Sequence, residues 1–153
     1  MALILPVKGK QPKYDESCWF APNATIVGDV TMGKHGTVWF NAVVRGDVHS
    51  IHMGDYVNIQ DGAIIHCTYQ KHPTVIGNYV SIAHNAIVHG CTIEDEVLIG
   101  MGAIVMDGAV IEKNAIVAAG AIVTQGTRVK SGTIYAGNPA KYLKDVSPEL
   151  GEV

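Results

Sequence analysis

The sequence predicts an all-β fold, a parallel β-helix in which short strands wind into a triangular prism of about six coils. Three observations predict it: a six-residue repeat runs through most of the chain, an aliphatic residue, usually β-branched, begins nearly every repeat, and 48% of the residues are hydrophobic although only 7% are aromatic. Small and β-branched side chains suit closely spaced strands. An amphipathic helix would instead require a period of 3.6 residues.

The repeat is clearest from Ile99 onward, where consecutive rows read IGMGAI, VMDGAV, IEKNAI, VAAGAI, VTQGTR and VKSGTI. A unit of this length is one short strand and one turn, and it cannot bury its apolar residue alone, so successive units must stack. We expect the first residue of each row to point inward and the small fifth residue to let the chain pass a corner. Three rows then close one coil.

The same register continues backward from Ile99 and gives eighteen rows in all. Their first residues are Phe20, Ile26, Met32, Val38, Val44, Met53, Ile59, Ile65, Ile76, Ile82, Val88, Ile93, Ile99, Val105, Ile111, Val117, Val123 and Val129. The longer steps from Val44 to Met53 and from Ile65 to Ile76 predict loops at corners. The alternative fold, a β-sandwich, would show turn signals every eight to twelve residues or so.

The chain is expected to form a single domain over residues 1–153, with the repeat at 20–135 and a tail at 136–153. The register breaks after Tyr135. In the tail, Pro139 followed by AKYLK predicts a short C-terminal helix.

Composition excludes several classes of function. The net charge is −3 and Lys and Arg form no run, so neither a nucleic-acid nor a membrane partner is expected. No apolar stretch is long enough to span a bilayer, and the N-terminus does not resemble a signal peptide. Cys18, Cys67 and Cys91 lack metal-site spacing, which fits reduced thiols in a cytoplasmic protein. The expected partners are small molecules and copies of the chain itself.

Three of the seven histidines fall into a geometric pattern. Residues at the same row position three rows apart stack about 4.8 Å apart on one face of the prism. His66 and His89 are both second in their rows, which are three rows apart, and Arg45 occupies the same column one coil earlier. His84 is third in its row, on another face, and Asp61 stacks in its column.

His84 lies around a corner from His66 and His89, so one chain would not bring all three to one ion. A neighbouring subunit can supply the third histidine, and packing about a three-fold axis then gives a homotrimer with three shared sites. Three imidazoles and an open fourth position suit catalytic Zn²⁺, while Fe²⁺ and Co²⁺ also accept such ligands. The remaining histidines are expected to be solvated or hydrogen-bonded: His35, His49, His52 and His72.

The segment VRGDVHSIHMGDYVNIQDGAIIH, followed by IAHNAIVHGCTI, resembles the γ-class carbonic anhydrases of the transferase hexapeptide superfamily. The shared elements are Arg45 to Asp47, Asn58 to Asp61, His66, and His84 to His89. The resemblance implies that the β-helix is left-handed and that His66, His84 and His89 bind the metal.

The resemblance also implies roles for the surrounding residues. Arg45 and Asp47 would form ion pairs that hold the trimer, and Gln60 would orient the metal-bound water. Asn58 and Asp61 would lie at the interface or beside the metal ligands. Tyr135 approximately matches a tyrosine that lies near the metal in this family.

The activity implied is attack of metal-bound hydroxide on CO₂ to give bicarbonate, with no other cofactor. The chain departs from the family pattern at two places that serve proton export. Val48 stands where active members carry a glutamate, and the loop CTYQKHPT, residues 67–74, holds no carboxylate. His72 or His49 would be the remaining proton carriers, and slow or absent CO₂ hydration is therefore an expected outcome.

Two other functions stay open. The scaffold also suits a hexapeptide acyltransferase or acyl-CoA thioesterase, although such enzymes normally use one histidine as a base. The third candidate is a non-catalytic metal-binding trimer, which the missing carboxylates favour and Gln60 does not.

Overall fold

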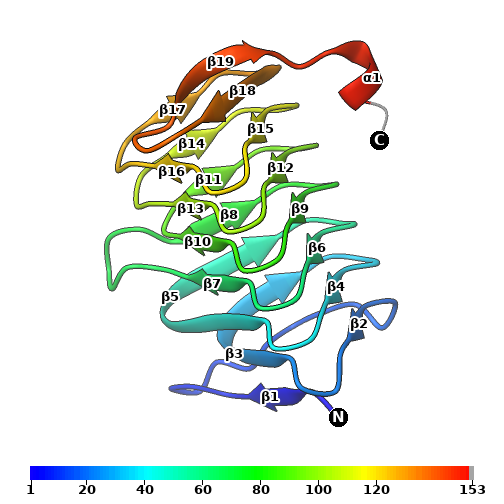
Figure 1. Ribbon diagram of the computed structural model, residues 1–153. Helices are drawn as coiled ribbons and strands as arrows, with labels where there is room; N and C mark the ends of the chain where they lie inside the picture. Colours follow the sequence, from blue (N-terminus) through cyan, green and yellow to red (C-terminus); the bar gives the residue numbers. More distant parts are fainter. Residues whose placement is uncertain (152–153) are drawn as a thin grey trace.

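The computed structural model, which describes residues 1–151 and side chains through Glu149, is a triangular prism of stacked coils (Figure 1). It is a left-handed parallel β-helix with the N-terminus at one end and the C-terminal strands at the other. Each face of the prism is a column of short parallel strands, as the six-residue register predicts. We name the faces 1, 2 and 3 in the order in which the chain meets them from Thr25.

Face 1 carries the two aligned histidines. Its strands are β3 (Thr25–Met32), β5 (Val43–Met53), β7 (Ile64–His66), β10 (Ile87–His89), β13 (Ile104–Val105) and β16 (Ile122–Val123). Face 2 contains the second halves of β3 and β5 followed by β8 (Thr74–Ile76), β11 (Thr92–Ile93), β14 (Val110–Ile111) and β17 (Arg128–Val129). Because β3 and β5 continue from face 1 to face 2, these faces form one sheet of 11 strands that also includes β1 (Leu3–Leu5).

Face 3 is a second sheet of 8 strands. It consists of β2 (Trp19–Phe20), β4 (Thr37–Val38), β6 (Asn58–Ile59), β9 (Ser81–Ile82), β12 (Leu98–Ile99), β15 (Ile116–Val117), β18 (Thr133–Ala136) and β19 (Lys141–Asp145). All its pairs are parallel except the last, in which β19 runs antiparallel to β18.

The core is a column of aliphatic side chains along the prism axis. Every row-starting residue from Ile26 to Val129 is buried, with at most 4% of its surface exposed, whereas Phe20 at the first coil is only partly buried. The fifth-position alanines, such as Ala63 and Ala86, are fully buried at the corners. The predicted inward positions are therefore confirmed.

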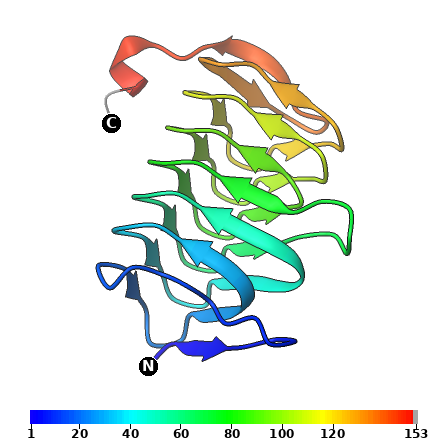
Figure 2. The same cartoon turned by 180° about the vertical axis from the view of Figure 1, so that it is seen from behind.

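Both longer steps place their added residues at a corner, but only one of them interrupts the strands. Between Val44 and Met53 the chain runs on as β5, and residues 47–50 form a bulge at the corner between faces 1 and 2, because Gly46 pairs with Gly28 whereas Ile51 already pairs with Val30. Ile51 provides an additional inward side chain there. The step from Ile65 to Ile76 does contain a loop, which projects from the prism between β7 and β8 (Figure 2).

The helix predicted at AKYLK is also wrong, because Lys141–Asp145 is strand β19. The last coil leaves the backbone groups of β18 without a partner, and pairing with β19 satisfies them and covers this edge. A one-turn helix, α1 (Pro148–Gly151), follows and begins at a proline, as first turns tolerate. No helix among residues 1–151 has the length and hydropathy needed to traverse a bilayer.

Candidate metal centre

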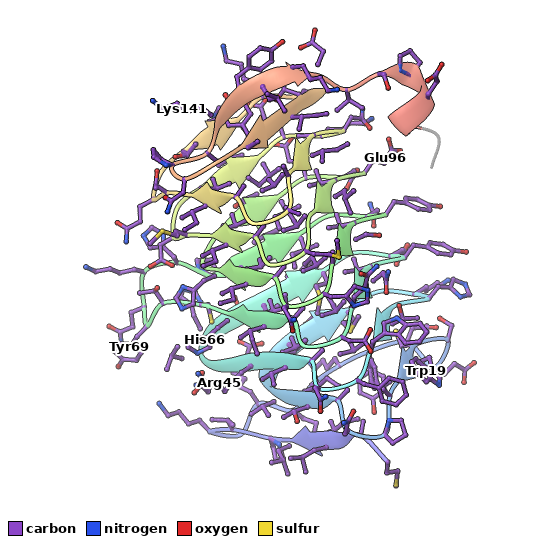
Figure 3. The ribbon with its side chains drawn as sticks, viewed as in Figure 1. Trp19, Arg45, His66, Tyr69, Glu96 and Lys141 are labelled. Carbon is purple, nitrogen blue, oxygen red and sulfur yellow. The ribbon has the colours of Figure 1, made fainter. Side chains whose placement is uncertain are left out.

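His66 and His89 face each other on neighbouring coils of face 1. Strands β7 and β10 pair in the register that sets the two histidines opposite one another. Nδ1 of His66 lies 3.2 Å from Nε2 of His89, and the ring centroids are 5.1 Å apart. Figure 3 shows His66 and Arg45 on the same side of the prism, with Trp19 on the opposite side of the view.

A carboxylate holds the other nitrogen of each ring. Nε2 of His66 lies 2.9 Å from Oδ1 of Asp47, and Nδ1 of His89 lies 2.6 Å from Oδ1 of Asp107. An ionised carboxylate only accepts hydrogen bonds, so each ring donates its proton there. In the neutral imidazoles, the two nitrogens that face each other then both carry lone pairs.

Both carboxylates are held in the ionised form. Burial raises the pKa of Asp107, but hydrogen bonds from Thr68 and His89 outweigh it, so the net pKa lies below the usual value. Asp47 behaves in the same way: burial opposes ionisation, and hydrogen bonds from His66 and Arg45 lower its pKa overall.

The pair of nitrogens fits a metal ion. In a tetrahedral site with metal–nitrogen bonds of about 2.0–2.1 Å, two ligand nitrogens lie about 3.3 Å apart, which matches the 3.2 Å between His66 and His89. Ligating histidines usually donate their other N–H to a carboxylate, as both rings do here. A cation between the lone pairs would also remove their mutual repulsion.

His84 lies at the corner between β9 and β10, and 51% of its side chain is exposed. Its Nδ1 is 3.2 Å from Oδ1 of Asp61, the residue that the register stacks beneath it. Nε2 is therefore the nitrogen left for a metal. Within residues 1–151, no three His, Cys, Asp or Glu side chains of this one chain come close enough together to hold an ion.

Three other predicted site residues, Arg45, Gln60 and Asn58, differ in what they contact. Arg45 pairs with Asp47 and so reaches His66 only through that carboxylate. Gln60 follows β6 directly and precedes Asp61, so it belongs to the His84 corner. Oδ1 of Asn58 accepts hydrogen bonds from Thr37 and from the indole of Trp39, each of 2.9 Å.

Tyr135 is not brought to the histidines within one chain. It lies in β18, partly buried against the core, with its ring 6.4 Å from that of Tyr142. Strand pairing places it three coils above Ile82, the row to which His84 belongs. Its predicted place near the metal stays a prediction.

Asp107 and Thr68 were missed by the sequence reasoning, although a signal for Asp107 exists. Asp107 is third in the row that begins at Val105, and Val105 pairs with Val88 one coil earlier. The same register that aligned the histidines thus places Asp107 above Gly90, beside His89. No comparable signal predicts Thr68, because it opens the irregular loop after β7.

Two thiols near the histidines are unsuited to be ligands. Cys67 and Cys91 are buried in the core, and burial raises their pKa values to about 11 and about 12. They remain protonated at neutral pH, whereas metal ligation needs the thiolate.

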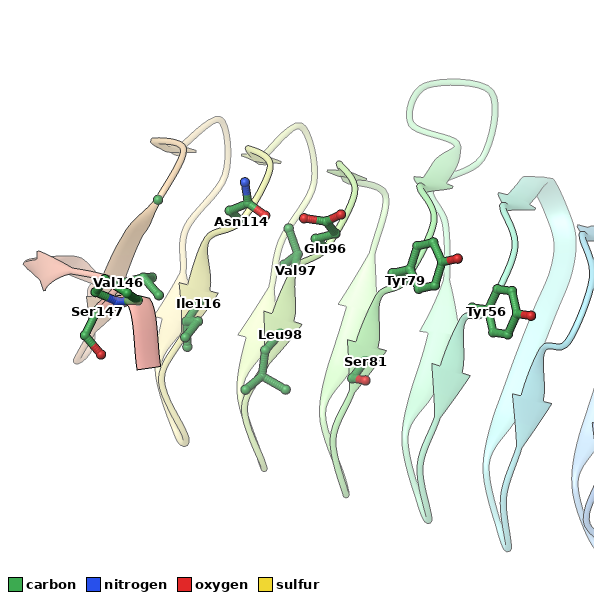
Figure 4. A pocket seen from close by; sticks show the side chains of 12 residues that line it. Tyr56, Tyr79, Ser81, Glu96, Val97, Leu98, Asn114, Ile116, Val146 and Ser147 are labelled. Carbon is green, nitrogen blue, oxygen red and sulfur yellow. The ribbon is translucent and has the colours of Figure 1, made fainter. Parts of the chain in front are cut away.

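A groove of about 790 Å³ lies elsewhere, along face 3 and the corner between faces 2 and 3 (Figure 4). Tyr56, Tyr79, Glu96 and Leu98 line it together with residues that precede and begin α1. None of the predicted site residues lies in it.

Comparison with known proteins identifies the family. The family model described as bacterial transferase hexapeptide (six repeats) matches residues 90–125. The chain is 44% identical over 151 residues to gamma carbonic anhydrase 1, mitochondrial, of Arabidopsis thaliana, covering 95% of this chain and 55% of that protein. It is 41% identical to a carbonic anhydrase of Geobacillus kaustophilus, covering 96% of this chain and 80% of that protein.

The chain belongs to the γ-class carbonic anhydrase family. It nevertheless spans only about half the length of the Arabidopsis relatives that it matches. Among solved structures, a hexapeptide transferase family protein from Anaplasma phagocytophilum is 42% identical with a TM-score of 0.94, over 98% of this chain and 88% of that one. A Bacillus cereus protein is 39% identical with a TM-score of 0.96, over 99% and 87%. For this family member, the β-helix is thus confirmed independently of its repeat.

Proposed function

We propose that this γ-class family member is a metal-dependent carbonic anhydrase that converts CO₂ to bicarbonate, and that its metal sites lie between the subunits of a homotrimer. The observation that carries the proposal is the pair of imidazole nitrogens on His66 and His89, 3.2 Å apart, with each ring held by its own carboxylate. Its carbonic anhydrase relatives support the reaction.

In the proposed site, His66 and His89 of one subunit and His84 of its neighbour hold the ion, for which we propose Zn²⁺, with Fe²⁺ or Co²⁺ as alternatives. A divalent ion held by three neutral imidazoles lowers the pKa of water to about 7 and so supplies a nucleophile for CO₂ at neutral pH. Asp47, Asp107 and Asp61 each fix one imidazole. Gln60 follows β6 directly and precedes Asp61, and its proposed role is to orient the attacking water with its amide.

Face 1 has the character of a subunit interface. Its outward-pointing residues form an apolar column, each paired with the next coil and each partly exposed: Val43, Ile64, Ile87, Ile104 and Ile122. His66 and His89 lie on the same face. A second chain that covered this column would therefore approach the two histidines.

The corner that carries His84 presents exposed apolar side chains, which suit contact with the apolar face 1 of another subunit. Phe40 lies one coil below Asp61, and its carbonyl accepts a hydrogen bond from the N–H of Gly62. Met101 lies one coil above His84, whose carbonyl accepts a hydrogen bond from the N–H of Gly102. Phe40 is 42% exposed and Met101 is 57% exposed. Two exposed apolar side chains that flank a His–Asp pair suit burial against the face 1 of a neighbour.

Slow turnover is part of the proposal. Active members of the family carry a glutamate at the position of Val48. Here the aliphatic side chain of Val48 packs against the core and cannot carry a proton. A cytoplasmic location stays a prediction, supported by the three free cysteines.

Subunit mixing tests the shared site. His84→Ala destroys the corner half of the site and His89→Ala destroys the face half, so each variant alone should neither retain metal nor hydrate CO₂. In randomly reassembled trimers of equal amounts, about a quarter of the interfaces combine an intact face with an intact corner. We therefore expect about a quarter of the wild-type metal content and hydration rate to return.

The matched control mixes His66→Ala with His89→Ala, which are both face defects and cannot complement each other. Recovery in this control, or no recovery in the first mixture, would contradict a site shared between subunits. Metal uptake without any CO₂ hydration by the wild type would instead indicate the non-catalytic trimer. Acyl-CoA turnover that survives removal of the metal would indicate an acyltransferase, the activity suggested by the Anaplasma neighbour's family name.

A further inference from the structure

Asp107 reaches His89 from the coil above it. It follows β13, the strand next to β10, and its Oδ1 accepts a 2.6 Å hydrogen bond from Nδ1 of His89. Its Oδ2 accepts a 2.5 Å hydrogen bond from the hydroxyl of Thr68. Both carboxylate oxygens are engaged, so the carboxylate cannot turn away from the imidazole without losing a hydrogen bond.

The backbone around this carboxylate leaves space for it. Gly90, directly after His89, has a positive φ of 58°, and a Cβ at this position would lie 2.5 Å from Oδ1 of Asp107. Thr68 is itself anchored, since its backbone pairs with His72 across the loop after β7. Gly90 and the loop that carries Thr68 therefore together determine where the carboxylate of Asp107 lies.

The two carboxylates act on the histidine pair from opposite ends. The strand order on face 1 is β5, β7, β10 and β13, so Asp47 approaches His66 from below and Asp107 approaches His89 from above. They engage Nε2 of His66 and Nδ1 of His89, which are different nitrogens of the ring. Both remaining lone pairs consequently point into the space between the two rings.

We propose that Asp107, held by Thr68, is a positioning residue that fixes His89 in the tautomer with the proton on Nδ1 and thereby turns Nε2 toward the shared metal site. The proposal deepens the proposed function and rests on it for its consequence in metal binding. Its structural part, the tautomer of His89, concerns this chain alone.

The tautomer can be measured in metal-free protein from the ¹⁵N chemical shifts of the histidine rings. We expect wild-type His89 to carry its proton on Nδ1, and Asp107→Ala to populate the form with the proton on Nε2. Asp107→Asn keeps an oxygen that can accept the hydrogen bond and should preserve the wild-type tautomer. An unchanged tautomer in Asp107→Ala would overturn the proposal whether or not the protein binds metal.

Metal affinity supplies the second measurement, by titration of each metal-free variant with Zn²⁺ or Co²⁺. Loss of a carboxylate that holds a ligating histidine weakens binding by about 10- to 100-fold, and we expect this for Asp107→Ala. Thr68→Val should weaken binding less, and should have no further effect in the Asp107→Ala background, because Thr68 acts through Asp107. Additive losses in the double variant would contradict that coupling.

Asp15→Ala is the matched control. Asp15 also accepts a hydrogen bond from a hydroxyl, that of Ser17 at 2.6 Å, but lies near the N-terminus. It should change neither the His89 tautomer nor the affinity. If wild-type protein binds no metal while Asp107→Ala still shifts the tautomer, the proposed function fails and the positioning role stands.

Discussion

At the scale of single residues, each of the three proposed metal-binding histidines has its own aspartate. The pairs are His66 with Asp47, His84 with Asp61 and His89 with Asp107. Each pair joins residues from different coils, so the stacking of coils builds the pairs. His66 is 17% exposed and His84 is 51% exposed. His89 is 34% exposed, so the two histidines on face 1 are more buried within one chain than His84 at the corner.

Asn58 provides a prediction at this scale. Its Oδ1 accepts two hydrogen bonds, from Thr37 and Trp39, and neither donor belongs to a histidine. We expect Asn58→Ala to lower the free energy of unfolding by about 1–2 kcal/mol, because two half-buried donors lose their acceptor. Metal content should be unchanged. Urea unfolding at a fixed protein concentration measures the first effect, since the stability of an oligomer depends on concentration.

The control for Asn58 is Ser81→Ala, one coil above in the same column. It should stay within about 0.5 kcal/mol of the wild type. Loss of metal from Asn58→Ala with unchanged stability would place Asn58 in the metal site, as the family resemblance implies, rather than in the framework of face 3.

At the scale of elements, the corner between faces 2 and 3 is held by a ladder of side-chain oxygens. Oδ1 of Asp55, Asn78 and Asp95 each accepts a 2.7 Å hydrogen bond from a backbone N–H one coil below. Glycines make room for these oxygens; at Gly54 a Cβ would lie 2.3 Å from Oδ1 of Asn78. The ladder therefore needs both an Asx side chain and a neighbouring glycine in each coil.

A double-mutant cycle tests this requirement. Gly54→Ala should destabilise the protein by about 1–3 kcal/mol, the usual cost of forcing an extra carbon into a packed site. The same substitution should cost less in an Asn78→Ala background, because the oxygen that it collides with is gone. Chemical denaturation of the four proteins gives the coupling free energy. Equal costs in both backgrounds would show that Asn78 is not the source of the collision.

Most elements were predictable because a six-residue period determines which side chain points inward. The segments that the sequence misassigned are those where pairing between coils overrides local pattern. Val44 to Met53 stays one strand, with a bulge at the corner, because β3 pairs with it on both sides of that corner. Lys141–Asp145 forms a strand because the open edge of β18 needs a partner. Pairing at the edge of a sheet or across a corner leaves no pattern within a single six-residue row, so the sequence could not predict it.

The site was predictable to the same degree. The column of His66 and His89 follows from counting rows, as does the pairing of Asp61 with His84. Thr68 could not be foreseen, because the loop that carries it has no register. The direction in which a ring turns also depends on which nitrogen its carboxylate engages, and that is visible only in three dimensions.

At the scale of the whole molecule, the three faces differ in their outward surfaces. On face 2 the outward column is interrupted by polar residues, including His52, Thr92 and Arg128. On face 3 it contains Thr37, Asn58 and Ser81. Face 1 alone presents an unbroken aliphatic column from Val43 to Ile122, so it is the face best suited to contact another copy of the chain.

Ile87→Arg tests face 1 as the subunit interface. Ile87 lies in the middle of the aliphatic column, between Ile64 and Ile104. An arginine there would place one charge from each subunit in an apolar contact without a partner, which is strongly unfavourable. We expect a folded monomer by sedimentation velocity, with a wild-type circular dichroism spectrum and no bound metal.

Val110→Arg is the control. It makes the same change in the outward column of face 2, next to the natural Arg128, and should leave the mass of the assembly unchanged. A trimer that survives Ile87→Arg, or one that Val110→Arg dissociates, would assign the interface to a different face and separate His84 from the histidine pair.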